Sequence, residues 1–159
     1  MSGNLWLDLL VVLLFILVGS VFVITEIAFV SLRESQVSHL AEQNGRRGTK
    51  VARLAKDPNL FLAAAQIGVT FAGFLSAALG GATLEGQLSP VFESWGLSSG
   101  VSGLLSLLLI TMVIAYFSLV LGELVPKRLA LQSPERIALA TAPALTWWSG
   151  LMRPVIALL

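Results

Sequence analysis

Glu123 stands inside a strongly apolar segment, three residues before Pro126 and four before Lys127. Because Pro126 has no backbone N–H, the carbonyl of Gly122 loses its usual helical partner. A carboxylate and an unpaired carbonyl oxygen then lie side by side at membrane depth. Hard cations such as Mg²⁺ bind to oxygens of these two kinds. The spacing therefore indicates an ion-binding site within a membrane.

The composition indicates an integral membrane protein. The chain has 159 residues, of which 56% are hydrophobic and 12% charged, and its mean hydropathy is +0.87. A soluble domain carries about 25% charged residues. A net charge of +1, with no basic stretch interleaved with aromatics, gives no sign of nucleic-acid binding. With no cysteine and His39 as the one histidine, thiolate metal sites and serine–histidine hydrolysis are disfavoured.

Three apolar runs, at about 5–32, 60–82 and 101–125, predict an all-α membrane fold with three transmembrane helices. Each run has at least the ~20 residues that ~30 Å of hydrocarbon requires. The N-terminus lacks the basic region of a cleaved signal peptide, so the first run is read as a retained span. All ten Lys and Arg lie between the first two runs or after the third. The positive-inside rule then makes those segments cytoplasmic and the N-terminus external.

The segments 35–56 and 133–159 are predicted to form juxtamembrane helices on the cytoplasmic side. The second contains Trp147, Trp148 and Arg153. A fourth span would carry Arg153 outside, whereas a pair of interfacial helices keeps it inside and puts the tryptophans at headgroup depth. We therefore favour the interfacial pair. The chain stops in the middle of a hydrophobic pattern, which indicates a further domain beyond it.

Several oxygen-bearing side chains lie within the apolar runs. Glu26 is a second acid, and either Glu26 or Glu123 could instead reach the interface or pair with a nearby base. Gln66 and Thr70 are four residues apart and share a helix face. A single membrane serine or threonine usually bonds to its own helix, but a group around a carboxylate can bind a metal. The candidate ligands are Glu123, Gly122, Ser20, Gln66, Thr70, Ser118 and Glu26.

The second run also carries small residues at four-residue spacing, which lets helix backbones approach closely. They could pack within one protomer or between two, and the spacing does not separate these alternatives. Because three helices make only a small enclosure for an ion, we expect a homodimer. The stripe consists of Gly68, Ala72, Ser76 and Gly80.

Three segments resemble the transmembrane domain (DUF21) of the CorC/cyclin M (CNNM) family, and the resemblance covers essentially all of residues 1–159. They are Glu26-Ile-Ala-Phe-Val-Ser, Gln66-Ile-Gly-Val-Thr-Phe-Ala-Gly and Gly122-Glu-Leu-Val-Pro-Lys-Arg. The resemblance implies a homodimeric transporter in the inner (plasma) membrane that exports Mg²⁺ in exchange for Na⁺. It also implies that cytoplasmic CBS-pair domains follow, often with a small CorC-type domain, and that ATP binds only to the CBS-pair domains.

The chain departs from the family at three positions where many members carry a polar side chain. Many members carry asparagines where Val69 and Gly73 stand here, and often a serine where Val23 stands. The ligands must therefore come from other positions.

Our leading hypothesis is a Mg²⁺ transport domain whose site opens towards the cytoplasm. The alternative is a membrane anchor and dimerisation module that regulates another transporter or relays signals to cytoplasmic domains. An intramembrane enzyme is disfavoured, because no Ser–His, paired-Asp or His–metal constellation lies within the apolar runs.

Overall fold

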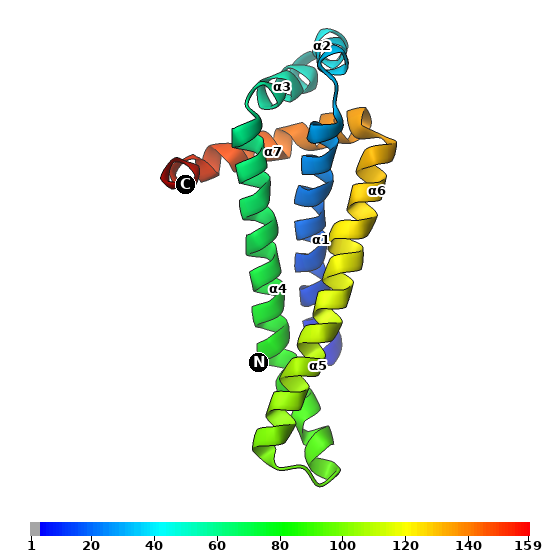
Figure 1. Cartoon of the computed structure of the whole chain (residues 1–159), viewed down its shortest axis with the longest axis vertical. Helices are drawn as coiled ribbons and strands as arrows, with labels where there is room; N and C mark the ends of the chain where they lie inside the picture. The colour runs from blue at the N-terminus through cyan, green and yellow to red at the C-terminus, as the bar shows by residue number, and fades with distance from the viewer. Residues whose placement is uncertain (1–3) are drawn as a thin grey trace.

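The computed structural model describes residues 4–159, which are almost entirely helical (Figure 1). Because α5, the π-helical turn η1 and α6 follow one another without interruption, these residues form six helices. The all-α prediction is confirmed. In chain order the elements are α1 (Leu5–Ser31), α2 (Glu34–Gln43), α3 (Gly45–Lys56), α4 (Pro58–Ser94), α5 (Ser99–Leu119), η1 (Val120–Leu124), α6 (Val125–Gln132) and α7 (Pro134–Leu158).

Three of these helices are long and apolar enough to cross a membrane, namely Leu5–Ser31, Pro58–Ser94 and Ser99–Gln132. They run side by side along the long axis of the molecule (Figure 1). Polar caps mark where two of them begin: the side chain of Asn4 accepts a hydrogen bond from Trp6 N, and that of Asp57 from Leu60 N. The second helix continues well past the apolar run, to Ser94, before the chain turns into α5.

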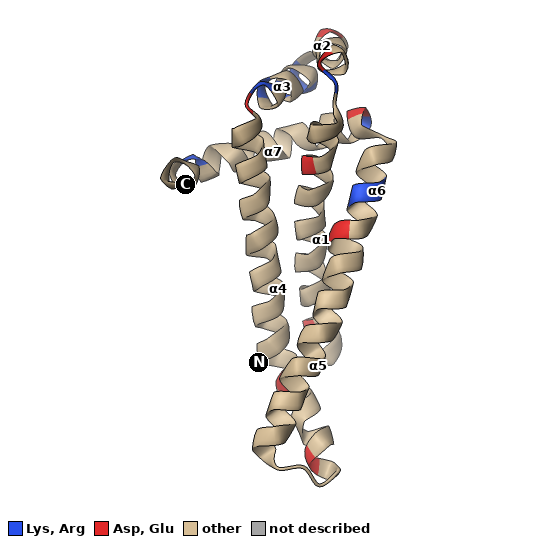
Figure 2. Cartoon of the chain, in the orientation of Figure 1, with Lys and Arg blue, Asp and Glu red and all other residues tan. Residues whose placement is uncertain are grey.

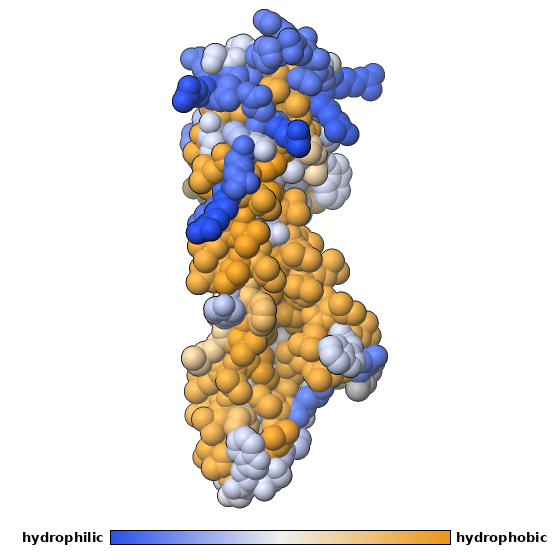
Figure 3. Space-filling model, turned by 90° about the vertical axis from the view of Figure 1, so that its right-hand side faces the viewer, coloured by the Kyte–Doolittle hydropathy of each residue, from blue (hydrophilic) through white to orange (hydrophobic). Residues whose placement is uncertain are grey.

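Charge is distributed unevenly along the long axis. The Lys and Arg residues lie in the segment 33–56, in α6 and in α7, which share one end of the molecule (Figure 2). Asp8, Glu85 and Glu93 lie towards the other end. On the face that Figure 3 shows, hydrophobic residues cover most of the surface between the two ends, and hydrophilic residues gather at the end formed by α2 and α3. Such a surface matches a hydrocarbon layer flanked by water.

The helix α4 packs through its small residues. A Cβ atom at Gly68 would lie 2.6 Å from the ring of Phe22 in α1, and one at Gly80 would collide with Ile114 in α5. Small side chains therefore allow the three long helices to approach closely. The sequence did not show whether the stripe of small residues packs within one protomer or between two. In the structure the stripe is buried within a single chain, so it serves packing inside the protomer; its members are Gly68, Ala72, Ser76 and Gly80.

The tail forms one helix, α7, which continues through Pro143 and Pro154. The predicted pair of helices is therefore wrong. In Figure 1, α7 lies across the ends of α1 and α4, and it is not one of the candidate spans. The indole N–H of Trp148 donates to the carbonyl of Ala64 at 2.8 Å, which ties α7 to α4. Trp147 is exposed, as expected of a residue at headgroup depth.

The helices α2 and α3 form a hairpin that closes the basic end of the bundle. Gly45 provides the turn with a positive φ of 57°, and the hairpin packs on α7 and on the adjoining ends of α1 and α4. This contact is a hydrophobic core composed of Phe29, Leu40, Val51, Leu54, Phe61, Ala64, Ala138, Ala142 and Leu145.

We expect Gly48→Ala to destabilise this hairpin. A Cβ atom at Gly48 would overlap the backbone carbonyl of Leu40, which cannot move without separating α2 from α3. Overpacking of this kind costs about 1–3 kcal/mol, so the midpoint of thermal unfolding in detergent should fall. Gly86→Ala is the matched control, because its Cβ would enter open space, and its midpoint should be unchanged or higher. Equal midpoints for both variants would contradict the tight crossing.

Candidate metal site

The third long helix widens where Pro126 interrupts its hydrogen bonds. Residues Val120–Leu124 form a π-helical turn, and the backbone N–H of Val125 donates to the carbonyl of Val120, five residues back. Proline cannot supply the N–H that an α-helical ladder needs at this point. Such turns often occur at functional sites. The turn contains Gly122 and Glu123, the two residues that the sequence singles out.

A small cavity lies against this turn, between all three long helices. Its volume is about 30 Å³, more than the ~10–15 Å³ that one water molecule needs. Glycines on each of the three helices keep bulky side chains out of it. The lining consists of Phe15, Ile16 and Gly19 from α1, Val69, Gly73 and Ser76 from α4, Ser118 from α5, and Gly122 and Glu123 from η1.

The polar groups of the cavity are one carboxylate and two hydroxyls. Ser76 is buried, and its hydroxyl donates to the carbonyl of Val12 at 3.3 Å. A Cβ atom at Gly122 would lie 3.6 Å from Ser118 Oγ and 3.9 Å from the carbonyl oxygen of Ile16. Side-chain and backbone oxygens from α1 and α5 therefore approach the π turn. Mg²⁺ is typically bound by one or two carboxylates together with water, and this donor set fits such a mode.

The charge of Glu123 is partly balanced by Lys127. Their side chains lie one helical turn apart, with Lys127 Nζ 3.7 Å from Glu123 Oε2, and each is 47% exposed. An exposed pair of this kind contributes about 0.2–1 kcal/mol. A divalent ion with several oxygen ligands can displace so weak a partner. The ion pair therefore leaves the carboxylate available to the cavity.

The structure brings together three of the predicted ligands and leaves four outside the cavity. Glu123, Gly122 and Ser118 line it. The hydroxyl of Ser20 donates to the carbonyl of Leu17 in its own helix at 2.7 Å. The remaining three, which also lie outside the lining, are Gln66 and Thr70, whose exposed side chains contact each other at 3.4 Å, and Glu26.

Ser76 is a polar lining residue that sequence reasoning did not propose as a ligand. Ser76 belongs to the stripe of small residues at four-residue spacing on α4, a pattern that the sequence analysis assigns only to helix packing. Among the described residues, no three or more His, Cys, Asp or Glu side chains lie close enough together to hold a metal ion. Any metal in the cavity would therefore depend on hydroxyl, carbonyl and water oxygens around a single carboxylate.

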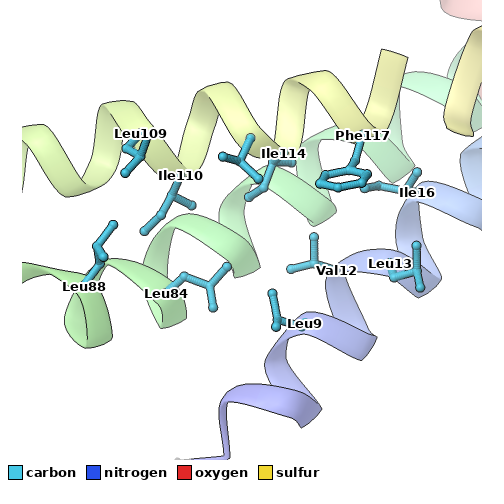
Figure 4. A pocket seen from close by; sticks show the side chains of 11 residues that line it. Leu9, Val12, Leu13, Ile16, Leu84, Leu88, Leu109, Ile110, Ile114 and Phe117 are labelled. Atoms are coloured by element: carbon cyan, nitrogen blue, oxygen red, sulfur yellow. The ribbon is translucent and has the colours of Figure 1, made fainter. Parts of the chain in front are cut away.

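An apolar trough adjoins the cavity between the same helices and shares Ile16 with it. Its volume is about 360 Å³. Figure 4 shows aliphatic side chains from α1, α4 and α5 pointing towards one another, with Phe117 beside Ile16 at one end. The lining consists of Leu9, Val12, Leu13 and Ile16 from α1, Leu84 and Leu88 from α4, and Leu109, Ile110, Val113, Ile114 and Phe117 from α5.

Three long apolar helices, with one carboxylate and two hydroxyls beside a small cavity between them, define a membrane domain. The chain belongs to the CNNM family: the model described as the cyclin M transmembrane N-terminal domain matches residues 9–159. The resemblance inferred from the sequence is thereby confirmed. The family is linked to cation and magnesium transport, and the chain is a membrane protein.

Curated relatives cover nearly all of this chain. UPF0053 protein sll0260 of Synechocystis is 39% identical over 158 residues, which are 99% of this chain and 35% of the relative. UPF0053 protein YrkA of Bacillus subtilis is 30% identical over 150 residues, 94% of this chain and 35% of the relative. The polyamine export protein of Haemophilus influenzae is 24% identical over 156 residues, 98% of this chain and 36% of that protein. The chain thus spans about a third of the length of these relatives.

Proposed function

We propose that this domain transports Mg²⁺ across the membrane, with the ion bound in the cavity beside the π turn. The observation that carries the proposal is the cavity itself, which has the size of one small ligand and contains Glu123, Ser118 and Ser76. It lies among three helices that could span a membrane, in a family linked to cation transport. A purely structural anchor needs no such space.

The charge distribution supports an orientation with the basic end in the cytoplasm. The N-terminus and the α4–α5 turn would then be external, and the membrane would be the inner (plasma) membrane. Glu123 stands one turn from Lys127, on the basic side of the third span (Figure 2). The site would therefore open towards the cytoplasm. Export from it requires a second, outward-open state, which a Na⁺ gradient would drive.

A second copy of the chain would cover part of the exposed apolar surface of α5. Met112 is 68% exposed and Tyr116 is 63% exposed on this helix. A homodimer that buries them would also enclose the third span and its π turn more completely. ATP would act only through soluble domains attached to the membrane domain.

Binding would proceed by exchange of one cation for another at Glu123. Mg²⁺ gives up its water reluctantly and prefers six oxygens in near-octahedral geometry. Glu123 would supply the charge, while Ser118, Ser76 and the Gly122 carbonyl would replace or hold part of the water shell. When the ion leaves, the ammonium group of Lys127 would neutralise the carboxylate.

Flux into liposomes tests this proposal against the anchor and dimerisation alternative. The purified protein should raise the signal of an internal Mg²⁺ indicator above that of empty liposomes, and an opposed Na⁺ gradient should increase the rate. Absence of protein-dependent Mg²⁺ movement under every Na⁺ gradient would favour the anchor module.

A second candidate substrate is a polyamine. One relative is named a polyamine export protein, and the trough supplies the observation that favours such a cargo here. An ammonium group could pair with Glu123 while the attached methylenes lie along the trough, which shares Ile16 with the cavity. Because every residue that lines the trough is apolar, the second ammonium group would have to extend beyond it to water or lipid headgroups. Apolar surface buried in this way contributes about 25 cal/mol per Å². Mg²⁺ gains nothing from the trough.

Gly73→Asn separates these two substrates. Gly73 lines the cavity, and a Cβ atom there would meet nothing within 4 Å, so a longer side chain can be accommodated. The new amide oxygen should raise Mg²⁺ affinity by about tenfold, the equivalent of ~1.4 kcal/mol. Binding of putrescine should gain less, because a hydrogen bond from its ammonium group to the amide oxygen only replaces one to water.

Calorimetry with MgCl₂ and with putrescine provides the measurement, and Gly73→Ala is the control that fills space without adding an oxygen. An unchanged Mg²⁺ affinity in Gly73→Asn, together with tight putrescine binding, would favour the polyamine.

A further inference from the structure

The helix α3 carries half of the positive charge of the chain. Five of the ten Lys and Arg residues lie within its twelve residues, and it contains no acid. Four of them follow one another at spacings of four, three and three residues, so they share one face. We call this face the basic row; it consists of Arg46, Lys50, Arg53 and Lys56.

The opposite face of α3 holds the basic row in a fixed position. Val51 and Leu54 are buried in the core formed with α2, α4 and α7. The amide of Gln36 donates to Glu135 Oε1 at 2.8 Å, which attaches α2 to the first turn of α7. The row therefore belongs to a packed helix pair and not to a loose terminal segment.

No residue of the basic row forms an ion pair with another described residue. The one ion pair within 4.0 Å among the described residues joins Glu123 to Lys127, which lie on the third span and not on α3. Asp57 follows the row directly, but its carboxylate accepts from the N–H of Leu60 and caps α4. Like charges three and four residues apart repel one another. Four such residues on one face therefore create a site for an external anion.

The row begins beside a candidate membrane span, where lipid headgroups would lie. Only Asp57 separates Lys56 from Pro58, the first residue of a candidate span. From Lys56 the row extends about 15 Å along the helix at 1.5 Å per residue. Figure 2 shows the Lys and Arg of α3 at the end of the molecule where α4 begins. Basic residues that lie directly beside a span attract anionic lipids.

We propose that the basic row binds the phosphate groups of anionic phospholipids and so fixes the α2–α3 hairpin to the membrane surface. The lipid is favoured over a soluble acidic partner because the row begins within two residues of a membrane span. The proposal rests on the membrane position of α4 and is independent of which cation the cavity carries.

Quenching of tryptophan fluorescence by brominated lipids tests the proposal. In a Trp6→Phe/Trp95→Phe background, the remaining tryptophans are Trp147 and Trp148, which lie on α7 beside the hairpin. In bilayers of brominated phosphatidylglycerol mixed with phosphatidylcholine, quenching should exceed that seen when phosphatidylcholine carries the bromine. High salt should reduce this preference.

In the variant Arg46→Gln/Arg53→Gln, the preference for the anionic lipid over phosphatidylcholine should fall by about fivefold for each charge removed, the equivalent of ~1 kcal/mol per basic residue. Arg128→Gln/Arg136→Gln removes the same net charge from α6 and α7, and it should retain the preference. An equal loss in both variants would reveal a general charge effect and overturn the assignment to α3. If the parent protein showed no preference for the anionic lipid, the proposal would also be overturned, and the basic row would face water or bind an acidic protein segment instead.

Discussion

Glu123→Gln should lower the affinity for Mg²⁺ by at least about thirtyfold and reduce transport in proportion. The substitution keeps the shape of the side chain but removes the one carboxylate of the cavity. Loss of one partner from a buried, hydrogen-bonded charge pair costs about 2–5 kcal/mol, and partial exposure of Glu123 places the expected loss towards the lower limit. Calorimetric titration with MgCl₂ in detergent measures the affinity, and liposome flux measures transport.

The matched control for this prediction is Glu26→Gln. Glu26 is the other acid well inside an apolar run, and it does not line the cavity. The same chemical change there should leave the Mg²⁺ affinity within about twofold of the parent, or ~0.4 kcal/mol. A larger loss from Glu26→Gln than from Glu123→Gln would place the site elsewhere on the bundle.

Pro126→Ala should stabilise the domain and weaken its Mg²⁺ binding. With an N–H at position 126, the carbonyl of Gly122 regains an α-helical partner, and the π turn over Val120–Leu124 is no longer required. A proline within a helix costs about 3 kcal/mol, so the thermal midpoint should rise. Closing the turn should also rotate Glu123 away from Ser118 and reduce Mg²⁺ affinity by about tenfold, or ~1.4 kcal/mol.

Pro90→Ala is the corresponding control. Pro90 is exposed within α4, beyond the apolar run and away from the cavity. Its replacement should raise stability without changing the Mg²⁺ affinity. If Pro126→Ala also left the affinity unchanged, the π turn would not contribute to ion binding.

The sequence was sufficient to predict the main elements because each has a strong local cause. The three apolar runs exceed the length of a span, and all ten basic residues flank them on one side. Pro126 likewise identified the point at which the hydrogen bonding of the third helix departs from the α-helical pattern. The extent of α7 could not be predicted in this way. Two internal prolines suggested a break, whereas packing on α1, α3 and α4 keeps the helix continuous.

The composition of the site was predictable along one helix but not between helices. Ser118, Gly122 and Glu123 lie close together because they are neighbours on the same span. Which face of α4 meets them depends on how its small residues pack against α1, and the sequence does not specify that rotation. Once Gly68 packs beside Phe22, Ser76 faces the cavity and Gln66 remains exposed.

Anomalous scattering from Mn²⁺, used in place of Mg²⁺ in crystals of the protein in lipid, tests the central claim most directly. Both ions favour oxygen ligands in octahedral geometry. We expect one peak per protomer between α1, α4 and the π turn, at a bonding distance from a carboxylate oxygen of Glu123. A carboxylate that stays paired with Lys127, with no peak in the cavity, would contradict the account.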